Sequence, residues 1–484
     1  MTPHPLPTST PAAEGVDARG VHAFLDAVEG APDIEPHSLM ILRHGRLIAS
    51  GWWAPYTAER PHLLYSLSKS FTSTAAGLAA AEGLLNLDDP VVSYFPEFEA
   101  EITDPGSRAM LVRHVAAMAS GHTEETLERA FGGDPEEPVR GFLLIPPDRA
   151  PGTVFAYNQP ATYTLAAIVQ RVTGQSLTEY LRPRLFDPLG IGETAWLQVP
   201  AGRDLGFSGL FATTDAIARL GLLYLRGGEW AGERLLPASW VAEATRVQIP
   251  TEGGMGEGTA PDWRRGYGFQ FWMSEHGYRG DGAYGQFCVV LPEHDVVIAT
   301  TADTVQMQAL LDAVWEHLLP AFGDAPLIGR EDEDAALERR LSRLALPPLA
   351  AKPAPLTDPA AWSGAEFAPA GGACADQPTL TGVTVAEDGT GGWSLALAEG
   401  ASRLEVGFDG AGWRTDTTPD APVPTAVSGG WTDPDTLTVD VAFLETPHHL
   451  VVTCSLADRA FTARWRTVPL HKGPLRSLRA PRPH

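Results

Sequence analysis

Two residues that could carry out chemistry, Ser66 and Lys69, stand in the stretch Tyr65-Ser66-Leu67-Ser68-Lys69-Ser70-Phe71. The stretch opens an apolar helical pattern, and residues three apart on a helix lie on the same face. The serine hydroxyl and the lysine amine can therefore touch. A serine becomes a nucleophile when a base removes its proton, and a lysine is such a base when burial and a helix N-terminus keep it neutral. The pair predicts nucleophilic catalysis at Ser66.

Lysine is scarce in this chain, which strengthens that prediction. Lys69, Lys352 and Lys472 are the only lysines among the 35 lysine and arginine residues. Arginine does not lose its proton in a protein, whereas lysine can. A chain that uses arginine almost everywhere else thus has lysine at the one place where a neutral amine is needed.

Tyr157 is the candidate for a second proton-transferring group. It lies in Pro151-Gly-Thr-Val-Phe-Ala-Tyr157-Asn158-Gln159, just before a helical pattern that contains Tyr163 and Leu165. A tyrosine hydroxyl near a lysine ammonium can have its pKa lowered enough to act as a base. Taken alone, a tyrosine at such a position is more often a core residue.

The elements that must position these residues come from both ends of a long first domain. Residues 16–29 have helical spacing, and residues 38–52 predict a β-hairpin with His44-Gly45 in the turn. Residues 88–226 are mostly helix and loop, enough for an all-helical insertion. Strands are expected again at 267–273, 277–284, 287–291 and 296–301, with a helix over 305–319. These pieces predict one sheet in a domain that we assign to residues 1–345.

The remainder of the chain has a different character. A Pro-rich stretch at residues 346–360 predicts a linker. Residues 361–484 contain short alternating runs separated by Gly and Asp-Gly turns, which predict an all-β domain, a small antiparallel sandwich or barrel. We expect this domain to be a structural or pocket-covering appendage, or the contact of a homo-oligomer.

Composition limits the classes of partner. The net charge of -25, with no basic run, argues against nucleic acid and anionic membranes as partners. No signal peptide is expected at the N-terminus, and no apolar run reaches the roughly 18 residues of a membrane helix. Three scattered cysteines argue against a disulfide framework or a zinc site. We expect a cytoplasmic protein that acts on a small molecule.

The order Ser-x-x-Lys, then Tyr, then a Gly-rich strand resembles the serine β-lactamase and penicillin-binding-protein superfamily, in particular its class C-like esterase and peptidase branch. The resemblance runs from about residue 15 to 320. Five further short motifs support the resemblance: Val112-Arg113-His114, Ser120-Gly121-His122, Pro151-Gly152-Thr153, Gly209-Leu210-Phe211-Ala212-Thr213 and Leu291-Pro292-Glu293. The resemblance implies an α+β domain with an antiparallel sheet flanked by helices and an all-helical subdomain.

The resemblance also implies roles for individual residues. Ser66 would form the acyl-enzyme, and Lys69 and Tyr157 would share the general base and acid roles. The backbone N–H groups of Ser66 and Ala283 would form the oxyanion hole. No metal or organic cofactor is implied.

The chain departs from the family pattern at the edge of the expected pocket. The family motif Lys-Thr-Gly followed by a small residue is replaced here by Gly280-Asp281-Gly282-Ala283. Gly280 therefore stands where relatives have a lysine that binds a substrate carboxylate. Arg279 could substitute for that lysine, while Asp281 adds negative charge. Gln159 stands where relatives commonly have Asn or Ser. We therefore expect Gln159, Asp281, Gly282 and Arg279 to contact substrate.

Other residues allow both a functional and a structural interpretation. Trp53, with Trp52 and Tyr56, could line an acyl pocket or be plain core. His62, His114 and His122 lack metal-ligand spacing and are expected to be structural. Ser208 is not in a nucleophile elbow, because the second glycine is misplaced.

The predicted activity is that of a serine hydrolase acting on small carboxylic esters, or less readily on amides. One alternative is a D-amino-acid peptidase or weak β-lactamase. Another is a non-catalytic ligand-binding protein with a penicillin-binding-like fold.

Overall fold

The chain forms two units in the computed structural model, which describes residues 5–252, 260–352, 354–355, 359–388, 392–418, 421–471 and 473–482. The first unit comprises Met1–Gly51, Leu64–Ser342 and Pro481–His484, and the second comprises Trp52–Leu63 and Arg343–Ala480. The segment that contains Trp53 thus packs with the C-terminal unit. Parts of the predicted linker, residues 353 and 356–358, lie outside the described residues.

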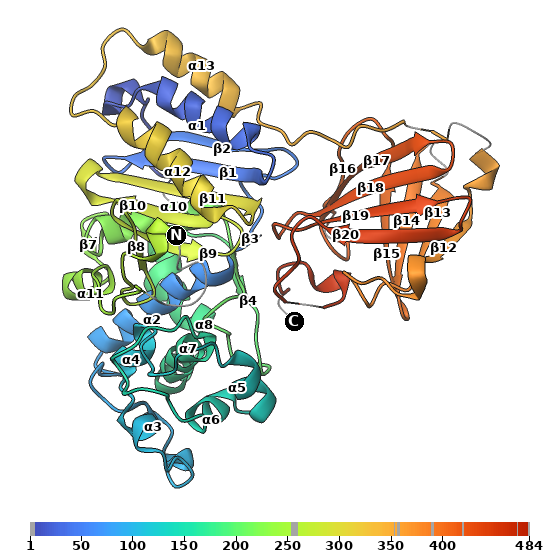
Figure 1. Cartoon of the computed structure of the whole chain (residues 1–484). Coiled ribbons are helices and arrows are strands. Elements are labelled where there is room, and N and C mark those ends of the chain that lie inside the picture. Colours follow the sequence, from blue (N-terminus) through green and yellow to red (C-terminus); the bar gives the residue numbers. More distant parts are fainter. Residues whose placement is uncertain are drawn as a thin grey trace. The chain divides into compact units, whose positions relative to one another are not determined.

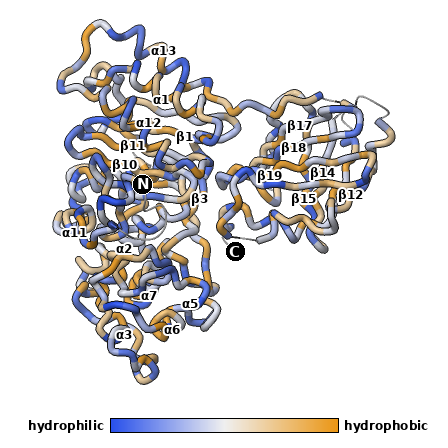
Figure 2. The backbone as a smooth tube through the Cα atoms, in the orientation of Figure 1, coloured by the Kyte–Doolittle hydropathy of each residue, from blue (hydrophilic) through white to orange (hydrophobic). Residues whose placement is uncertain are grey.

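A six-stranded sheet is the centre of the first unit (Figure 1). Its order is β2-β1-β11-β10-β9-β8, and β1 pairs with β11, β11 with β10, β10 with β9 and β9 with β8, all antiparallel. The strands are β1 (Ile34–Arg43), β2 (Arg46–Trp52), β8 (Trp272–Met273), β9 (Tyr278–Gly282), β10 (Gln286–Leu291) and β11 (Val296–Thr304). Every residue of β9, β10 and β11 is buried, as in a sheet covered on both faces. Figure 2 shows the hydrophobic residues along β10 and β11.

Helices cover both faces of this sheet. One face carries α1 (Ala18–Gly30), α12 (Met307–Ala313) and α13 (Glu331–Leu341), and α10 (Thr214–Leu225) packs on β10, β11 and β1 from the other. Asp17 caps α1, since its side chain accepts a hydrogen bond from the N–H of Arg19. The predicted helix 305–319 is split, because α12 gives way at Val314 to a wider π-helical turn, Val314–Leu318.

The predicted helical insertion follows the central helix α2 (Ser68–Ala81). Its members are α3 (Pro105–Ala109), α4 (Val112–Ala116), α5 (Leu127–Gly133), α6 (Pro138–Leu143), α7 (Gln159–Thr173), α8 (Leu177–Leu181) and α9 (Asp187–Leu189). The chain then returns through the antiparallel pair β4 (Ala195–Trp196) and β5 (Leu210–Ala212). A small hairpin, β6 (Glu229–Trp230) and β7 (Glu233–Arg234), and α11 (Ala238–Ala244) follow α10. Most residues of α2 are buried, so this helix lies between the sheet and the insertion.

The second unit is a nine-stranded, nearly closed barrel with the order β15-β14-β13-β12-β20-β19-β18-β17-β16. Its strands are β12 (Ala365–Pro369), β13 (Gly382–Glu387), β14 (Trp393–Glu399), β15 (Ser402–Phe408), β16 (Arg414–Asp416), β17 (Thr425–Asp433), β18 (Thr436–Phe443), β19 (His449–Ser455) and β20 (Ala460–Trp465). The interior is packed around Trp362, Trp393 and Trp431. The strands are not all antiparallel as predicted, since the first and last strands, β12 and β20, pair in parallel.

The short strand β3 (His62–Leu63) also belongs to the second unit, where the N–H of Leu63 donates to Glu445 O. Within the described part of the chain, no helix combines the length and the apolar character that crossing a bilayer requires.

Candidate active site

Ser66 and Lys69 are in direct contact. Ser66 lies in a short 3₁₀ turn, Tyr65–Leu67, that leads into α2, and Lys69 lies in the first turn of α2. The Lys69 ammonium donates to Ser66 Oγ at 2.9 Å and to Phe207 O at 2.8 Å. Ser66 is partly exposed, whereas Lys69 is only 1% exposed. A reachable hydroxyl thus touches a buried amine.

A segment far along the chain holds this end of α2. Ser68 Oγ accepts from the N–H of Leu210 at 3.0 Å, and Thr72 Oγ1 donates to Gly206 O at 2.8 Å. Gly206 has a φ of +70°, and a Cβ there would lie 2.3 Å from Ala166 Cβ. Glycine at 206 therefore lets the chain turn close to the helices, so that the carbonyl of Phe207 reaches Lys69.

Burial sets the protonation of Lys69. Loss of water around the amine lowers the pKa of Lys69 to about 7, and the negative charges of Glu125 and Asp281 oppose that shift. A substantial fraction of Lys69 is therefore neutral near pH 7. A neutral amine has a lone pair that can take the proton of Ser66.

The ring of Tyr157 faces the same amine. Lys69 Nζ lies 4.7 Å from the ring centroid, within the range of a cation–π contact. Tyr157 is stacked on Trp272 at 5.5 Å with an interplanar angle of 25°, and Tyr267 meets it edge-on at 6.1 Å. This aromatic support holds Tyr157 on the loop before α7, beside the Ser66–Lys69 pair.

The turn after β9 lies against the 3₁₀ turn of Ser66. A Cβ on Gly282 would stand 2.2 Å from Leu64 O and 3.1 Å from the nitrogen of Leu67, so only glycine allows this approach. Ala283 follows Gly282 directly. Its backbone is therefore close to the turn that contains Ser66, and the oxyanion hole expected from the N–H groups of Ser66 and Ala283 stays a prediction.

Two strained tyrosines flank these backbone groups. Tyr65 precedes Ser66 with a φ of +48°, and Tyr284 follows Ala283 with a φ of +69°. Their rings meet at 5.4 Å with an interplanar angle of 71°. Left-handed backbone at non-glycine residues is costly and gathers at functional sites, where the surrounding structure enforces it. The edge-to-face contact ties the two turns together.

Gly280, at the position of the family lysine, lies close to side chains of the turn before α2 and of α2 itself. A Cβ on Gly280 would lie 2.4 Å from Leu67 Cδ1 and 2.8 Å from Ser70 Oγ. A lysine at position 280 would therefore require the ends of these two side chains to move.

Arg279 and Asp281, both in β9, form a buried ion pair with each other. Arg279 Nε donates to Asp281 Oδ2 at 2.8 Å, and another guanidinium nitrogen donates to Ser274 Oγ at 2.7 Å. The Arg279 guanidinium also covers the ring of Trp263 at 4.3 Å and is fully buried. Burial raises the pKa of Asp281 to about 6, against the opposing charge of Arg279. The guanidinium is thus already engaged by protein groups, which argues against a direct contact with substrate. The predicted substrate contact of Arg279 stays a prediction.

Glu125 is a site residue that the sequence did not suggest. The N–H of Gln159, at the start of α7, donates to both carboxylate oxygens of Glu125, at 3.1 and 3.2 Å. The N–H of Leu127 donates to Oε1 at 3.0 Å. Removal of water around the carboxylate raises the pKa of Glu125, and these N–H groups and Lys69 oppose the shift. No spacing rule connects Glu125 with Tyr157, so no signal in the sequence could have identified it.

The remaining candidate site residues make contacts within the protein. Trp53 is buried in the second unit and is not among the residues gathered around Ser66 within the first. His114 Nδ1 accepts from the N–H of Leu111, and His122 bonds Ser120 and the carbonyl of Ile145. The carbonyl of Ser208 accepts from the indole of Trp196. The substrate contacts predicted for Trp53, Gln159, Gly282 and Asp281 stay predictions.

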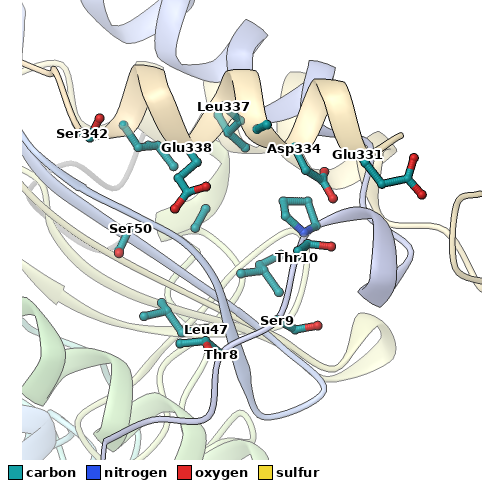
Figure 3. A pocket seen from close by; sticks show the side chains of 15 residues that line it. Thr8, Ser9, Thr10, Leu47, Ser50, Glu331, Asp334, Leu337, Glu338 and Ser342 are labelled. Atoms are coloured by element: carbon teal, nitrogen blue, oxygen red, sulfur yellow. The ribbon is translucent and has the colours of Figure 1, made fainter. Parts of the chain in front are cut away.

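A separate pocket of about 720 Å³ lies between the N-terminal segment, β2 and α13 (Figure 3). Glu331, Asp334 and Glu338 line it from α13, but Asp334 also accepts from the N–H of Ala12. None of the predicted site residues lines this pocket.

The chain belongs to the Beta-lactamase family, whose model matches residues 25–320. It is a serine hydrolase of that family, and the family and the α+β fold predicted from the sequence are confirmed.

Several proteins that are similar to this chain are named as hydrolases or esterases. The 6-aminohexanoate-dimer hydrolase of Paenarthrobacter ureafaciens is 28% identical over 292 residues, which are 55% of this chain and 74% of that protein. The lovastatin esterase of Penicillium rubens is 29% identical over 36% of this chain and 49% of its own length. Among solved structures, "EstCE1, a hydrolase with promiscuous acyltransferase activity" aligns with a TM-score of 0.50 at 18% identity, over 61% of this chain and 98% of that chain. At this identity the last comparison supports the fold alone.

Proposed function

We propose that this protein hydrolyses small carboxylic esters through an acyl-enzyme on Ser66. The observation that carries the proposal is the 2.9 Å contact between Lys69 Nζ and Ser66 Oγ, made by a lysine whose pKa is about 7. A base poised near the working pH is the most effective proton acceptor for a serine hydroxyl.

Acylation begins from neutral Lys69. Its amine takes the proton of Ser66 while Oγ attacks the ester carbonyl carbon, and the carbonyl oxygen gains negative charge. The backbone N–H groups of Ser66 and Ala283 donate to that oxygen. As the tetrahedral intermediate collapses, the bond to the leaving oxygen breaks, and Tyr157 gives that oxygen a proton, which Lys69 replaces.

Deacylation reverses these roles with water. Tyr157 and Lys69 together remove a proton from a water molecule, whose oxygen attacks the acyl carbon. The bond to Ser66 Oγ then breaks, and Oγ regains its proton from Lys69. The carboxylic acid leaves, and the starting protonation states return.

Esters without a carboxylate suit the charges around Gly280 better than β-lactams or peptides that carry a free carboxylate. The position of the family lysine is Gly280, and the nearest alternative cation, Arg279, is engaged by Asp281 and Ser274. Asp281 adds a carboxylate near Lys69. The name of the similar lovastatin esterase supports ester substrates. The 6-aminohexanoate-dimer hydrolase is named for a dimer of an amino acid, which supports amides as the second class.

A panel of esters, amides and β-lactams tests the proposal against wild type, Ser66→Ala and the control Ser93→Ala. Ser93 is exposed and donates to Pro90 O. Turnover of p-nitrophenyl esters should be strongest in the panel, unchanged in Ser93→Ala and lost in Ser66→Ala. Full ester turnover by Ser66→Ala would exclude the acyl-enzyme, and no turnover by a folded wild type would favour a non-catalytic binding protein.

A further inference from the structure

A tight turn carries the two aromatic residues that hold Tyr157. Tyr267 and Trp272 form an antiparallel bridge, and between them the N–H of Gly268 donates to Phe271 O at 2.8 Å. Tyr157 stacks on Trp272 at 5.5 Å and meets Tyr267 edge-on at 6.1 Å. The place of this turn therefore determines where the ring of Tyr157 rests.

Gln270 lies in this turn with a left-handed backbone. Its φ is +64°, a conformation that glycine adopts without the steric cost that a side chain brings. Gln270 is also only 2% exposed. Left-handed backbone at a non-glycine residue persists where the surrounding structure enforces it, and it gathers at functional sites. The contacts of the Gln270 side chain are what enforce it here.

The side chain of Gln270 joins the turn to two helices. Its Nε2 donates to Ala116 O at 2.7 Å and to Val115 O at 3.3 Å, both at the end of α4. Its Oε1 accepts from the hydroxyl of Thr162, in α7, at 2.8 Å. The amide thus uses its oxygen and both of its N–H groups. A side chain without an amide would leave buried polar groups of α4 and α7 without these partners, which is costly.

The backbone of Gln270 is bonded to the helix that carries Lys69. Its carbonyl accepts from Ser70 Oγ at 3.0 Å, and Ser70 directly follows Lys69 in α2. The helix α7 begins at Gln159, two residues after Tyr157. One residue therefore connects the helix of Lys69, the helix that follows Tyr157 and the turn on which the ring of Tyr157 rests.

We propose that Gln270 is a positioning residue, which fixes Tyr157 relative to Lys69 by holding the turn 267–272 on α4 and α7. This inference rests on the proposed function, because it concerns the proton transfer of the same site. Without the side-chain hydrogen bonds the turn can shift, the ring of Tyr157 moves away from the amine, and water reaches Lys69. Water around the amine would raise the pKa of Lys69, and Glu125 and Asp281, which also face it, favour the charged form in either case.

Kinetics with p-nitrophenyl acetate compare Gln270→Gly with the control Gln377→Gly. Glycine accepts the left-handed backbone at position 270, so that only side-chain contacts are lost. Gln377 is a buried glutamine of the second unit, and its amide donates to Thr379, Glu399 and Gly473. Gln270→Gly should lower kcat about 10²-fold with little change in KM, as expected for a displacement of about 1 Å. Gln377→Gly should keep wild-type kinetics.

A lysine titration gives a second readout that needs no turnover. The chain has three lysines, so protein that carries ¹³C at the lysine Cε atoms gives three signals in NMR spectra, and Lys69→Arg identifies the signal of Lys69. That signal should titrate near pH 7 in wild type and in Gln377→Gly. In Gln270→Gly it should titrate about one pH unit higher, because the amine gains water. A purely structural role for Gln270 would not move this titration.

Two outcomes would overturn the inference. One is a wild-type kcat in Gln270→Gly, and the other is a Lys69 signal that titrates there as it does in wild type. Gln270→Met keeps the length of the side chain and supplies the same comparison where Gln270→Gly does not fold. Ester turnover that persists in Ser66→Ala would instead exclude the acyl-enzyme, and the titration of Lys69 would still decide the role of Gln270.

Discussion

The Lys69 ammonium lies 2.9 Å from Ser66 Oγ, and the same amine donates to Phe207 O at 2.8 Å. These two acceptors fix the direction of the amine, and burial keeps water from solvating its charge. The lysine is therefore oriented toward the serine and is close to losing its proton at neutral pH.

Lys69→Arg should lower kcat/KM for a p-nitrophenyl ester by about 10²- to 10⁴-fold, the usual range for a lost general base. Arginine keeps the positive charge but does not deprotonate. The control Lys352→Arg changes an exposed lysine of the second unit and should have normal rates. A folded Lys69→Arg protein with a near-normal rate would exclude Lys69 as the base.

The pH profile of kcat/KM should rise through an apparent pKa near 7. Burial lowers the pKa of Lys69 to about 7, so the active neutral form is lost as the pH falls below that value. Well below pH 7 the rate should fall about tenfold per pH unit. Glu125, Asp281 and Tyr157 face this amine, and the two carboxylates oppose the shift when ionised. A flat profile between pH 5 and pH 9 would contradict the role of neutral Lys69.

Tyr157→Phe should keep the stacked contact with Trp272 while removing the hydroxyl that transfers protons. The expected loss in kcat is about 10²-fold or more, with unchanged thermal stability. Tyr94→Phe is the matched control, since it removes a hydroxyl that donates to Asp89. If the rates of both variants equal that of wild type, Tyr157 has no part in proton transfer.

Asp281→Asn should lower the free energy of unfolding by about 3–5 kcal/mol, because it leaves the buried guanidinium of Arg279 without its counter-charge. Glu243→Gln breaks a solvent-exposed pair with Arg246 and should cost about 1 kcal/mol or less. Urea unfolding of both variants measures the difference. Equal costs would mean that the Arg279–Asp281 pair contributes no more than a surface pair.

Local patterns in the sequence were sufficient for much of the fold. The helical spacing of residues 16–29 corresponds to α1, and the hairpin predicted at 38–52 corresponds to β1 and β2. The parallel pairing of β12 with β20 was not predictable, because it joins strands about ninety residues apart and leaves no periodic signal in either.

The candidate site likewise has features that local sequence spacing predicts and features that depend on tertiary packing. The contact between Ser66 and Lys69 follows from a spacing of three residues, even though Ser66 lies in a 3₁₀ turn rather than in α2 itself. The position of Glu125 depends on how α5 and α7 pack, and the burial of Arg279 depends on cover over both faces of β9. Such tertiary relationships are not encoded in local spacing.

Trapping the covalent intermediate tests the central claim most directly. Wild-type protein is mixed with p-nitrophenyl acetate, quenched in acid during the first turnover, digested and mapped by mass spectrometry. One acetyl group should appear on Ser66, and it should be absent from Ser66→Ala treated in the same way. An acetyl group on another residue, or p-nitrophenol release by Ser66→Ala at the wild-type rate, would contradict the account.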